Sequence, residues 1–326
     1  MAGRPAPNSP EAPVVGRFAP SPSGRMHLGN VYAALVAWLS ARSQGGRMLL
    51  RIEDLDPRCA SPERARQLID DLRWLGLDWD GEIVWQHDRL EAYREALGRL
   101  DDQGLLYPCF CSRAELHAAS APHASDGTPV YPGTCRGLGA EQVAERAAQR
   151  PAAWRLRVPD AGDPASTVRF RDRVYGERSE NLARECGDFL VRRSDGVYAY
   201  QLVVVVDDAL MGVSEVVRGN DLLGSTPRQI YLQGKLGYRT PSYAHVPMLK
   251  APDGRRLSKR DRDCDLGELK KVFGTPGRLL GRLACRAGLA PDDAPRTAEQ
   301  LADLFSWDAV RARRGDVVID EGFFSL

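Results

Sequence analysis

Residues 17–30 of the chain carry side chains suited to phosphate chemistry. They read Arg17-Phe-Ala-Pro-Ser-Pro-Ser-Gly-Arg-Met-His27-Leu-Gly-Asn30. We expect a strand from Val14 to Phe18, a turn stiffened by two prolines, and a helix that begins near His27. The N-terminus of a helix presents unpaired N–H groups and a partial positive charge, which favour a phosphate group.

A second segment, far along the chain, is also suited to phosphate. Arg255-Arg-Leu-Ser258-Lys259-Arg260 carries four basic residues and one hydroxyl within six positions, directly after a glycine turn at Asp253-Gly254. Such a loop can close over a polyphosphate. A turn or a basic loop alone is typical of any solvated surface, so the prediction of a shared site depends on the pair.

The strand and helix patterns of the first third indicate what positions these residues. Strands and helices alternate there, which is typical of a parallel, nucleotide-binding sheet. Ligands of such sheets lie beyond the carboxyl ends of the strands, where Arg17, Ser21 and Glu53 are expected. The expected elements are helix Leu28–Leu39, strand Met48–Ile52, helix 62–75, strand Ile83–Trp85 and helix 88–103.

The rest of the chain divides by composition into further segments. We predict a first catalytic half at 14–104, an insertion at 105–194, a second catalytic half at 195–250, and a basic loop with a short helical region at 251–326. Within the insertion, 153–158 and 168–175 are strand-like. Later elements are expected at strands Val213–Val217 and Tyr243–Leu249 and at helices 226–236, 267–272, 276–288 and 297–304.

Length and composition set broad limits. The chain has 326 residues, of which 43% are hydrophobic and 27% charged, enough for one large or two modest domains with a sizeable core. A net charge of +1 excludes binding of polyanions by bulk charge. Any RNA-binding surface must be local, and the arginine-dense stretches 147–173 and 255–262 are candidates, although a solvated mixed-charge face is the alternative for each.

The location of the protein is predicted from what the sequence lacks. No run approaches the roughly 18–20 apolar residues of a membrane helix. Residues 1–13 have no apolar signal-peptide core, and we expect a disordered tail there. The sequence therefore predicts a cytoplasmic protein, in which seven cysteines indicate thiols or metal ligands rather than disulfides.

The two segments resemble the His-Ile-Gly-His and Lys-Met-Ser-Lys-Ser signatures of class I aminoacyl-tRNA synthetases. The stretches 17–24, Arg51-Ile-Glu-Asp-Leu-Asp56 and Val205-Val-Asp-Asp-Ala-Leu-Met-Gly212 are similar to the glutamyl branch. The resemblance covers about residues 14–260. It implies an α/β fold: a Rossmann-like parallel sheet, an inserted zinc-binding lobe of the acceptor type, and a short helical C-terminal region. It also implies a helix at Gln201–Val206, where four valines favour a strand.

The reaction that this resemblance implies is attack of the glutamate carboxylate on the α-phosphate of ATP, which is bound with Mg²⁺. Fixed N–H donors and cations stabilise such a transition state. His27 and Gly29 are expected at the ATP phosphates, and Lys259 and Ser258 above them. Asn30 stands where the signature has a second histidine. Because asparagine carries no positive charge, we expect the transition state to lose the stabilisation of one charge-assisted hydrogen bond, and the reaction to be slower.

The resemblance also implies a pocket for glutamate. Arg17 is assigned to the side-chain carboxylate, Arg218 to the other carboxylate and Glu53 to the ammonium group. Ala19, Ser21 and Tyr200 are expected to line the same wall, although Tyr200 could instead be a core ring. Asp207 and Asp208 are expected to be structural, capping the helix or holding a loop.

A metal site is predicted in the insertion. Cys109, Cys111 and Cys135 offer three thiolates, whereas structural zinc takes four ligands. The resemblance implies that Tyr131 is the fourth ligand, and His117 and His123 remain alternatives. One structural zinc ion per chain is expected.

The short C-terminal region distinguishes members of the branch. After the basic loop only about 65 residues remain, too few for the large anticodon-binding region of a glutamyl-tRNA synthetase. The chain is therefore similar to the glutamyl-Q tRNA(Asp) synthetases. This likeness implies tRNA-independent activation of glutamate and its transfer to queuosine in the anticodon stem-loop of tRNA(Asp), by a monomer. The alternatives are a discriminating glutamyl-tRNA synthetase without an anticodon domain and a non-catalytic RNA-binding paralogue.

Overall fold

A strand that leads into a buried helix opens the fold, as the sequence predicts. The computed structural model describes residues 13–57, 60–112, 114–115, 130–255 and 265–325. The first third alternates strand and helix: β1 Val15–Phe18, α1 Leu28–Arg42, β2 Arg47–Ile52, α2 Pro62–Leu75, β3 Val84–Trp85, α3 Leu90–Asp102. Each element lies within a few residues of its predicted range.

Two sheets, one parallel and one mixed, adjoin at the centre of the molecule. The first is parallel and has the order β1-β2-β3. The second has the order β7-β6-β10-β9, in which β6, β10 and β9 are parallel and β7 is antiparallel to β6. Its strands are β6 Thr167–Asp172, β7 Gly176–Asn181, β9 Glu215–Gly219 and β10 Ser242–Val246. The backbone N–H of Ser214, just before β9, donates to the carbonyl oxygen of Val15 in β1 at 2.9 Å. The carboxyl ends of β1 and β9, at Phe18 and Gly219, therefore meet at one edge.

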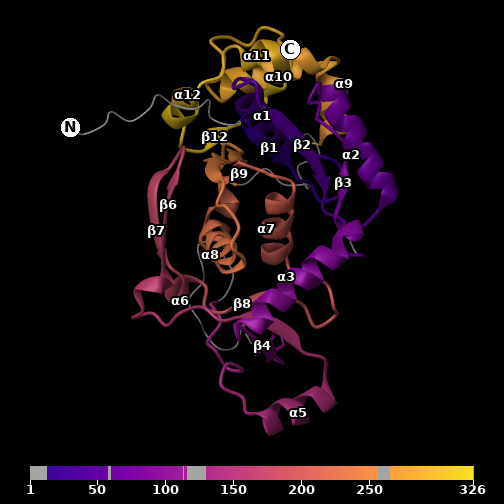
Figure 1. The fold of residues 1–326 in the computed structure, drawn as a ribbon. Coiled ribbons are helices and arrows are strands. Elements are labelled where there is room, and N and C mark those ends of the chain that lie inside the picture. Colours follow the sequence, from indigo (N-terminus) through magenta and orange to yellow (C-terminus); the bar gives the residue numbers. More distant parts are fainter. Residues whose placement is uncertain (1–12, 58–59, 113, 116–129, 256–264, 326) are drawn as a thin grey trace, which may run out of the picture.

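Helix α1 packs at the centre of the main hydrophobic core. Eleven of its fifteen residues are buried, from Leu28 to Ala41, because the helix is covered on nearly all sides. Helix α2 is amphipathic instead and buries one face. The C-terminal helices lie beside α1 at the upper end of Figure 1, so this core extends from the sheet into the C-terminal region.

The segment with four valines is a helix, as the family resemblance implied. Helix α7 spans Tyr200–Leu210, and Leu202 to Asp208 are all buried within it. Intrinsic β propensity is overridden because the helix packs against α3 and α8 Thr226–Leu236, which bury the branched side chains. Asp207 and Asp208 lie in its last turn.

A separate lobe extends from one end of the molecule, the lower end in Figure 1. An antiparallel sheet of β4 Leu106–Cys109, β5 Ala153–Leu156 and β8 Phe189–Arg192 joins it to the main body, and α5 Ala140–Gln149 lies at its tip with no buried residue. Between β5 and β8 the chain forms the hairpin β6 Thr167–Asp172 and β7 Gly176–Asn181, followed by α6 Leu182–Glu185. Strand β6 pairs in parallel with β10 of the second catalytic half.

Helices dominate the C-terminal region. Its elements are β11 Leu249–Lys250, α9 Leu266–Phe273, α10 Pro276–Arg286, α11 Ala298–Ala302, α12 Trp307–Ala312 and β12 Val317–Val318. Strand β12 pairs with β11, so the end of the chain returns to the residues before the basic loop. Short 3₁₀ helices lie at Gln86–Arg89, Pro164–Ser166, Asn220–Ser225 and Glu321–Phe323. Within the part of the chain that is described, no helix combines the length and the apolar character of a membrane span.

Candidate active site

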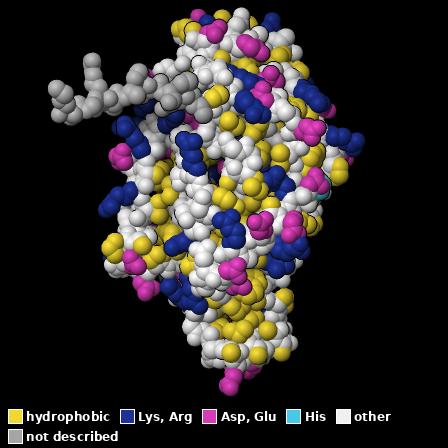
Figure 2. All heavy atoms as spheres, in the orientation of Figure 1, with side chains coloured by type: hydrophobic (Ala, Val, Ile, Leu, Met, Phe, Trp, Pro, Cys, Tyr) yellow, Lys and Arg dark blue, Asp and Glu magenta, His cyan; other side chains and the backbone are white. Residues whose placement is uncertain are grey.

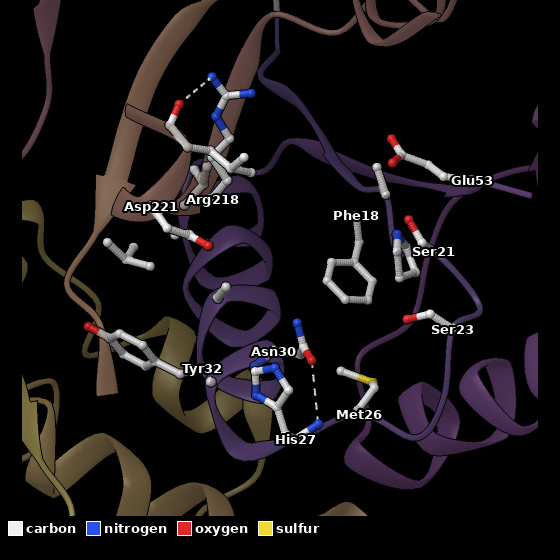
Figure 3. A pocket seen from close by; sticks show the side chains of 18 of the residues that line it. Phe18, Ser21, Ser23, Met26, His27, Asn30, Tyr32, Glu53, Arg218 and Asp221 are labelled. Carbon is white, nitrogen blue, oxygen red and sulfur yellow. Dashed lines mark hydrogen bonds between the residues drawn. The ribbon is translucent and has the colours of Figure 1, made fainter. Parts of the chain in front are cut away.

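A cavity of ≈ 400 Å³ opens where β1, β9 and the start of α1 meet. Its lining includes every residue that the sequence predicted for glutamate and those predicted for phosphate in the first segment: Arg17, Ala19, Ser21, His27, Gly29, Asn30, Glu53, Tyr200, Arg218. In Figure 3, Arg218 and Glu53 lie on opposite sides of this cavity, and His27 and Asn30 lie at the end where α1 begins. Residues as far apart in sequence as Arg17 and Arg218 are thus brought together around one space.

His27 is the N-cap of α1. Its Nδ1 accepts the backbone N–H of Asn30 at 3.4 Å, and the Asn30 Oδ1 accepts the backbone N–H of His27 at 3.4 Å. This reciprocal pair is a capping box, which satisfies two N–H groups at the helix start. With Nδ1 accepting, a neutral His27 ring carries its proton on Nε2. Asn30 therefore has a structural task in addition to any role in catalysis.

Gly29 makes room for the His27 ring. A Cβ atom at position 29 would lie 3.1 Å from Cε1 and 3.2 Å from Nδ1 of His27. Contacts this short require the ring to move. The absence of a side chain at Gly29 thus allows the His27 imidazole to lie at the N-terminus of α1.

The residues after the basic loop return to His27. Asp265 pairs with His27 in antiparallel fashion, and the N–H of Leu266 donates to the carbonyl oxygen of Met26 at 2.9 Å. Ser258 and Lys259, the predicted partners of the ATP phosphates, lie outside the described residues. One end of their segment is nevertheless fixed beside the cavity.

Arg17 and Glu53 belong to a buried network of ions. Arg51 is fully buried between three carboxylates, with Nη1 2.7 Å from Asp208 Oδ1, Nη2 3.3 Å from Glu53 Oε1 and Nε 3.6 Å from Asp207 Oδ2. Arg17 Nε lies 3.4 Å from Asp208 Oδ1. Asp208 thus links the two arginines and fixes the position of Arg17 in the cavity wall.

Burial and the arginines act in opposite directions on the acids of this network. Burial raises the pKa of Glu53, and Arg51 and Arg17 offset this only in part. Burial alone would also raise the pKa of Asp208, but the closer Arg51 and Arg17 guanidiniums bring it below its usual value. Asp208 is therefore held as a carboxylate, while Glu53 is more sensitive to what occupies the cavity.

Asp207 ties helix α7 to the segment after β3. Its carboxylate accepts from Gln86 Nε2 at 2.8 Å, Arg89 Nε at 2.6 Å and the Tyr93 hydroxyl at 2.9 Å. The predicted structural role of Asp207 and Asp208 agrees with these contacts. They act as buried acceptors for arginine rather than as helix caps.

Arg218 is held in a different way from Arg17. Arg17 lies beside the Asp208 carboxylate, whereas every described hydrogen-bond acceptor around Arg218 is neutral. Its Nε donates to His245 Nε2 at 3.0 Å, Nη1 to Gln229 Oε1 at 2.9 Å, and Nη2 to Thr226 Oγ1 at 2.8 Å. The Tyr200 hydroxyl lies 3.5 Å from Nη1, so Tyr200 faces the cavity together with Arg218.

The predicted metal-binding residues come together in the core of the lobe. The sulfur atoms of Cys109, Cys111 and Cys135 lie within 4.8 Å of one another. The Tyr131 hydroxyl is 3.5 Å from Cys109 Sγ and 3.7 Å from Cys111 Sγ. The three thiols could hold a metal ion, and the Tyr131 hydroxyl lies where it could serve as a fourth ligand. His117 and His123 lie outside the described residues.

Comparison with known proteins places the chain in a family. A family model described as tRNA synthetases class I (E and Q), catalytic domain, matches residues 13–306. A protein of Thiobacillus denitrificans named glutamyl-Q tRNA(Asp) synthetase is 50% identical over 283 residues, which cover 83% of this chain and 89% of that protein. The chain belongs to the glutamyl-Q tRNA(Asp) synthetase family of class I tRNA synthetases.

Further relatives agree with this family assignment. A glutamyl-Q tRNA(Asp) synthetase of Symbiobacterium thermophilum is 48% identical over 316 residues, covering 93% of this chain and 95% of the relative. The fold is similar to that of a glutamate tRNA ligase from Elizabethkingia meningosepticum, with a TM-score of 0.80 at 23% identity, over 96% of this chain and 68% of that one. The α/β class I synthetase fold with its parallel sheet is thereby confirmed.

Several residues of the site were not predicted from the sequence. Met26, Tyr32 and Asp221 line the cavity, and His245 and Gln229 hold Arg218. Arg51 belongs to the motif at residues 51–56, but nothing in the sequence of that motif indicates that the arginine is buried. A lone histidine in a strand such as His245 carries no signal of its own, because its partners lie on other strands and helices.

Proposed function

We propose that the protein activates glutamate with ATP in the absence of tRNA and transfers it to queuosine in the anticodon stem-loop of tRNA(Asp). The observation that supports this most directly is the single cavity, which is lined by both the predicted glutamate residues and the N-terminus of α1. The tRNA and the modified nucleoside in this proposal are taken from the names of the relatives, which are 46–50% identical to this chain over most of its length.

Recognition of glutamate follows from the charges around the cavity. Arg17 and Arg218 provide two cations, and Glu53 provides one anion opposite Arg218. Arg25 and Asp221, one charge of each sign, also line the cavity and leave this balance unchanged. Glutamate carries two carboxylates and one ammonium group, so the charges are complementary. A guanidinium can bind a carboxylate through two parallel hydrogen bonds, which favours arginine over lysine here. Which arginine binds which carboxylate stays a prediction.

Adenylate formation needs positive charge at the α-phosphate. The glutamate carboxylate oxygen attacks the α-phosphorus, a new P–O bond forms, and the bond to the β-phosphate oxygen breaks with release of pyrophosphate. In the proposed arrangement the Nε2–H of His27 and the N-terminal N–H groups of α1 donate to the phosphate oxygens. Mg²⁺ bound with ATP offsets part of the phosphate charge.

Lys259 and Ser258 are proposed to act on the same phosphates. Lys259 is six residues before Asp265, which pairs with His27. Six residues span at most about 20 Å, so the ammonium group is within reach of the cavity. The glutamyl group then passes to a hydroxyl of the queuosine cyclopentenediol, whose oxygen attacks the acyl carbon while AMP leaves.

Asn30 has a proposed role that differs from the histidine of the signature. Its side-chain oxygen belongs to the capping box with His27, so it positions the imidazole rather than supplying a cation. The absence of a second charge at this position predicts a lower maximal rate. The worth of one charge-assisted hydrogen bond is on the order of 1–3 kcal/mol.

The lobe is proposed to hold one structural zinc ion through Cys109, Cys111, Cys135 and Tyr131. A bound zinc would cross-link the two chain segments of the lobe and needs no open coordination position. We further propose that the protein works as a monomer in the cytoplasm.

ATP–pyrophosphate exchange tests the proposal directly. The protein, ATP, glutamate and labelled pyrophosphate are incubated without tRNA. Exchange supports the proposed function. Exchange only after addition of tRNA would favour a discriminating glutamyl-tRNA synthetase, and no exchange under either condition would favour a non-catalytic RNA-binding paralogue.

The acceptor of glutamate is tested by mass spectrometry. tRNA that contains queuosine is incubated with the protein, ATP and labelled glutamate, digested to nucleosides and analysed. Label on queuosine supports the proposal. Label on the 3′-terminal adenosine would contradict it.

A further inference from the structure

A chain of buried polar residues runs from strand β6 through β10 to Arg218. Asp172 and His245 are both completely buried, and Asp172 Oδ2 lies 2.6 Å from His245 Nδ1. On its other side the ring contacts Arg218 Nε through Nε2 at 3.0 Å and Thr226 Oγ1 at 3.2 Å. Nothing in the reaction outlined above uses this pair, although buried polar groups of this kind are costly unless they are fully hydrogen-bonded.

The surroundings of Asp172 require it to be a carboxylate. Its Oδ1 accepts the backbone N–H groups of Val174 and Tyr175, each at 2.9 Å, and faces that of His245 at 3.4 Å. These N–H groups can only donate, so Oδ1 must accept. Against the effect of burial, the hydrogen bonds from His245 and from the backbone of Val174 and Tyr175 hold the pKa of Asp172 below its usual value, so Oδ2 is an acceptor as well. The Nδ1 of His245 must therefore carry a proton and donate it to Oδ2.

The surroundings of Nε2 require it to be an acceptor. Arg218 Nε can only donate, because a guanidinium has no acceptor atom. With Nδ1 protonated toward Asp172 and Nε2 accepting from Arg218, the imidazole is neutral. In agreement, burial and then the Arg218 charge lower the pKa of His245 to about 4, against the opposing effect of Asp172.

A neutral anchor leaves the charge of Arg218 available. Arg17 and Arg51 each lie within 4 Å of a carboxylate, whereas no ion pair to Arg218 is found among the described residues. Its acceptors are the neutral atoms of His245, Gln229, Thr226, Tyr200 and the Leu222 carbonyl. A carboxylate in place of His245 would anchor the guanidinium equally well but would neutralise it.

We propose that Asp172 and His245 are positioning residues, which hold the Arg218 guanidinium toward the cavity and keep its charge unpaired for a carboxylate of glutamate. This inference rests on the proposed function, because it takes Arg218 as a ligand for glutamate. Asp172 fixes the tautomer of His245, and the tautomer decides whether Nε2 accepts from Arg218.

The variant Asp172→Asn tests the tautomer. The asparagine oxygen must face the N–H groups of Val174 and Tyr175, so its NH₂ group faces His245 Nδ1. The proton of His245 then moves to Nε2. Two donors, His245 Nε2–H and Arg218 Nε–H, then face each other, and the hydrogen bond between them is lost. We expect the KM for glutamate in tRNA-free exchange to rise roughly tenfold to a hundredfold, as for loss of a hydrogen bond to a charged group. The KM for ATP and the maximal rate should change by less than about threefold.

The second variant, His245→Gln, separates positioning from mere packing. A glutamine can place its side-chain oxygen near the Nε2 position and accept from Arg218 whatever stands at residue 172. His245→Gln alone should therefore raise the KM for glutamate only a few-fold. In the double variant Asp172→Asn/His245→Gln, the KM should return toward that of His245→Gln. Losses that simply add in the double variant would mean that Asp172 does not act on Arg218 through His245, and would overturn the proposal.

Nuclear magnetic resonance of ¹⁵N-labelled histidine reads the tautomer without any assay of activity. The chain has five histidines, which keeps the spectrum simple. The proposal requires the Nδ1–H form of His245 in the wild type and the Nε2–H form in Asp172→Asn. A wild-type ring that is protonated at both nitrogens, or at Nε2 alone, would overturn it even if a variant failed to fold.

Controls distinguish failure of this inference from failure of the proposed function. Asp102→Asn, an exposed change at the end of α3, should leave all constants unchanged. A wild-type protein without glutamate-dependent exchange refutes the proposed function. Wild-type exchange combined with an unchanged KM for glutamate in Asp172→Asn refutes the positioning role alone.

Discussion

The catalytic region and the cysteine lobe stabilise their polar groups in different ways. Around the cavity, charged residues such as Arg51 and Asp208 are embedded in a protein body whose main hydrophobic core includes most of α1 and extends into α9 and α10. The lobe has a separate core of five buried residues: Tyr107, Cys109, Phe110, Tyr131, Cys135. Most of that core consists of the proposed metal ligands themselves.

The difference shows which region can fold by hydrocarbon packing alone. The cavity rests on a large apolar core, so its ion network can be positioned before any ligand binds. The lobe buries too little apolar surface to fix three thiols and a phenol, and α5 adds no buried residue. We infer that the lobe depends on metal and the catalytic region does not. Figure 2 shows hydrophobic side chains gathered toward this lobe, whereas basic and acidic side chains are interspersed over the rest of the visible face.

The largest expected effect lies in the catalytic region. Lys259→Ala should lower glutamate-dependent ATP–pyrophosphate exchange roughly a hundredfold to a thousandfold, because one cation at the transition-state phosphates is lost. Glutamate affinity, measured by calorimetry, should barely change. Lys271→Ala removes an exposed lysine paired only with Glu268 and should leave exchange unaffected. Undiminished exchange in Lys259→Ala would show that the basic loop does not act on the phosphates.

The ion network should be costly to break. Asp208→Asn leaves Arg51 and Arg17 without their shared carboxylate in a buried site, so the free energy of unfolding should fall by about 3 kcal/mol or more. Urea denaturation measures this change. The matched variant Asp70→Asn breaks an exposed pair with Arg73 and should cost less than about 1 kcal/mol. Equal losses in the two variants would mean that the network adds nothing to the stability of the site.

Metal removal should act on the lobe and spare the cavity. Cys135→Ser, or chelation of the wild type, should open residues 107–111 and 130–149 to proteolysis and hydrogen exchange, since the proposed metal would cross-link the small core. Exchange of pyrophosphate should stay within about threefold of wild type. Cys285→Ser, at a half-buried cysteine outside the cluster, should change neither property. Loss of glutamate activation on chelation would contradict the independence of the two regions.

A smaller effect concerns the pH dependence of stability. Burial lowers the pKa of His245 from 6.5 to about 4. Between these values the unfolded chain binds a proton that the folded chain does not, so stability falls as the pH decreases through this window. His245→Gln should flatten this part of the profile, by up to about 3 kcal/mol near pH 4. A profile with the same slope in both proteins would contradict a neutral, buried imidazole.

The sequence predicted the members of the site better than the contacts that hold them. Residues 17–30 contain a strand, a turn and a helix N-terminus in local order, so the position of His27 follows from short-range rules. Glu53 is predictable because it follows a strand whose carboxyl end lies at this edge. The family resemblance supplied Arg218, Tyr200 and Tyr131, which no spacing rule indicates.

The remainder depends on contacts between distant parts of the chain. Asp208 meets Arg51 from 157 positions away, and Asp172 meets His245 from 73 positions away. A sequence pattern reports which face of an element is apolar, but not which polar group of another element satisfies a buried one. The capping role of Asn30 was local and could have been predicted, since asparagine three residues after an N-cap can accept its backbone N–H.

A crystal structure with a non-hydrolysable analogue of glutamyl-adenylate tests the central claim most directly. We predict that the glutamyl group lies between Arg17, Arg218 and Glu53, with the phosphate group at His27 and Lys259 turned toward it. An analogue bound away from this cavity, or with Arg218 and His27 contacting different molecules in separate clefts, would contradict it.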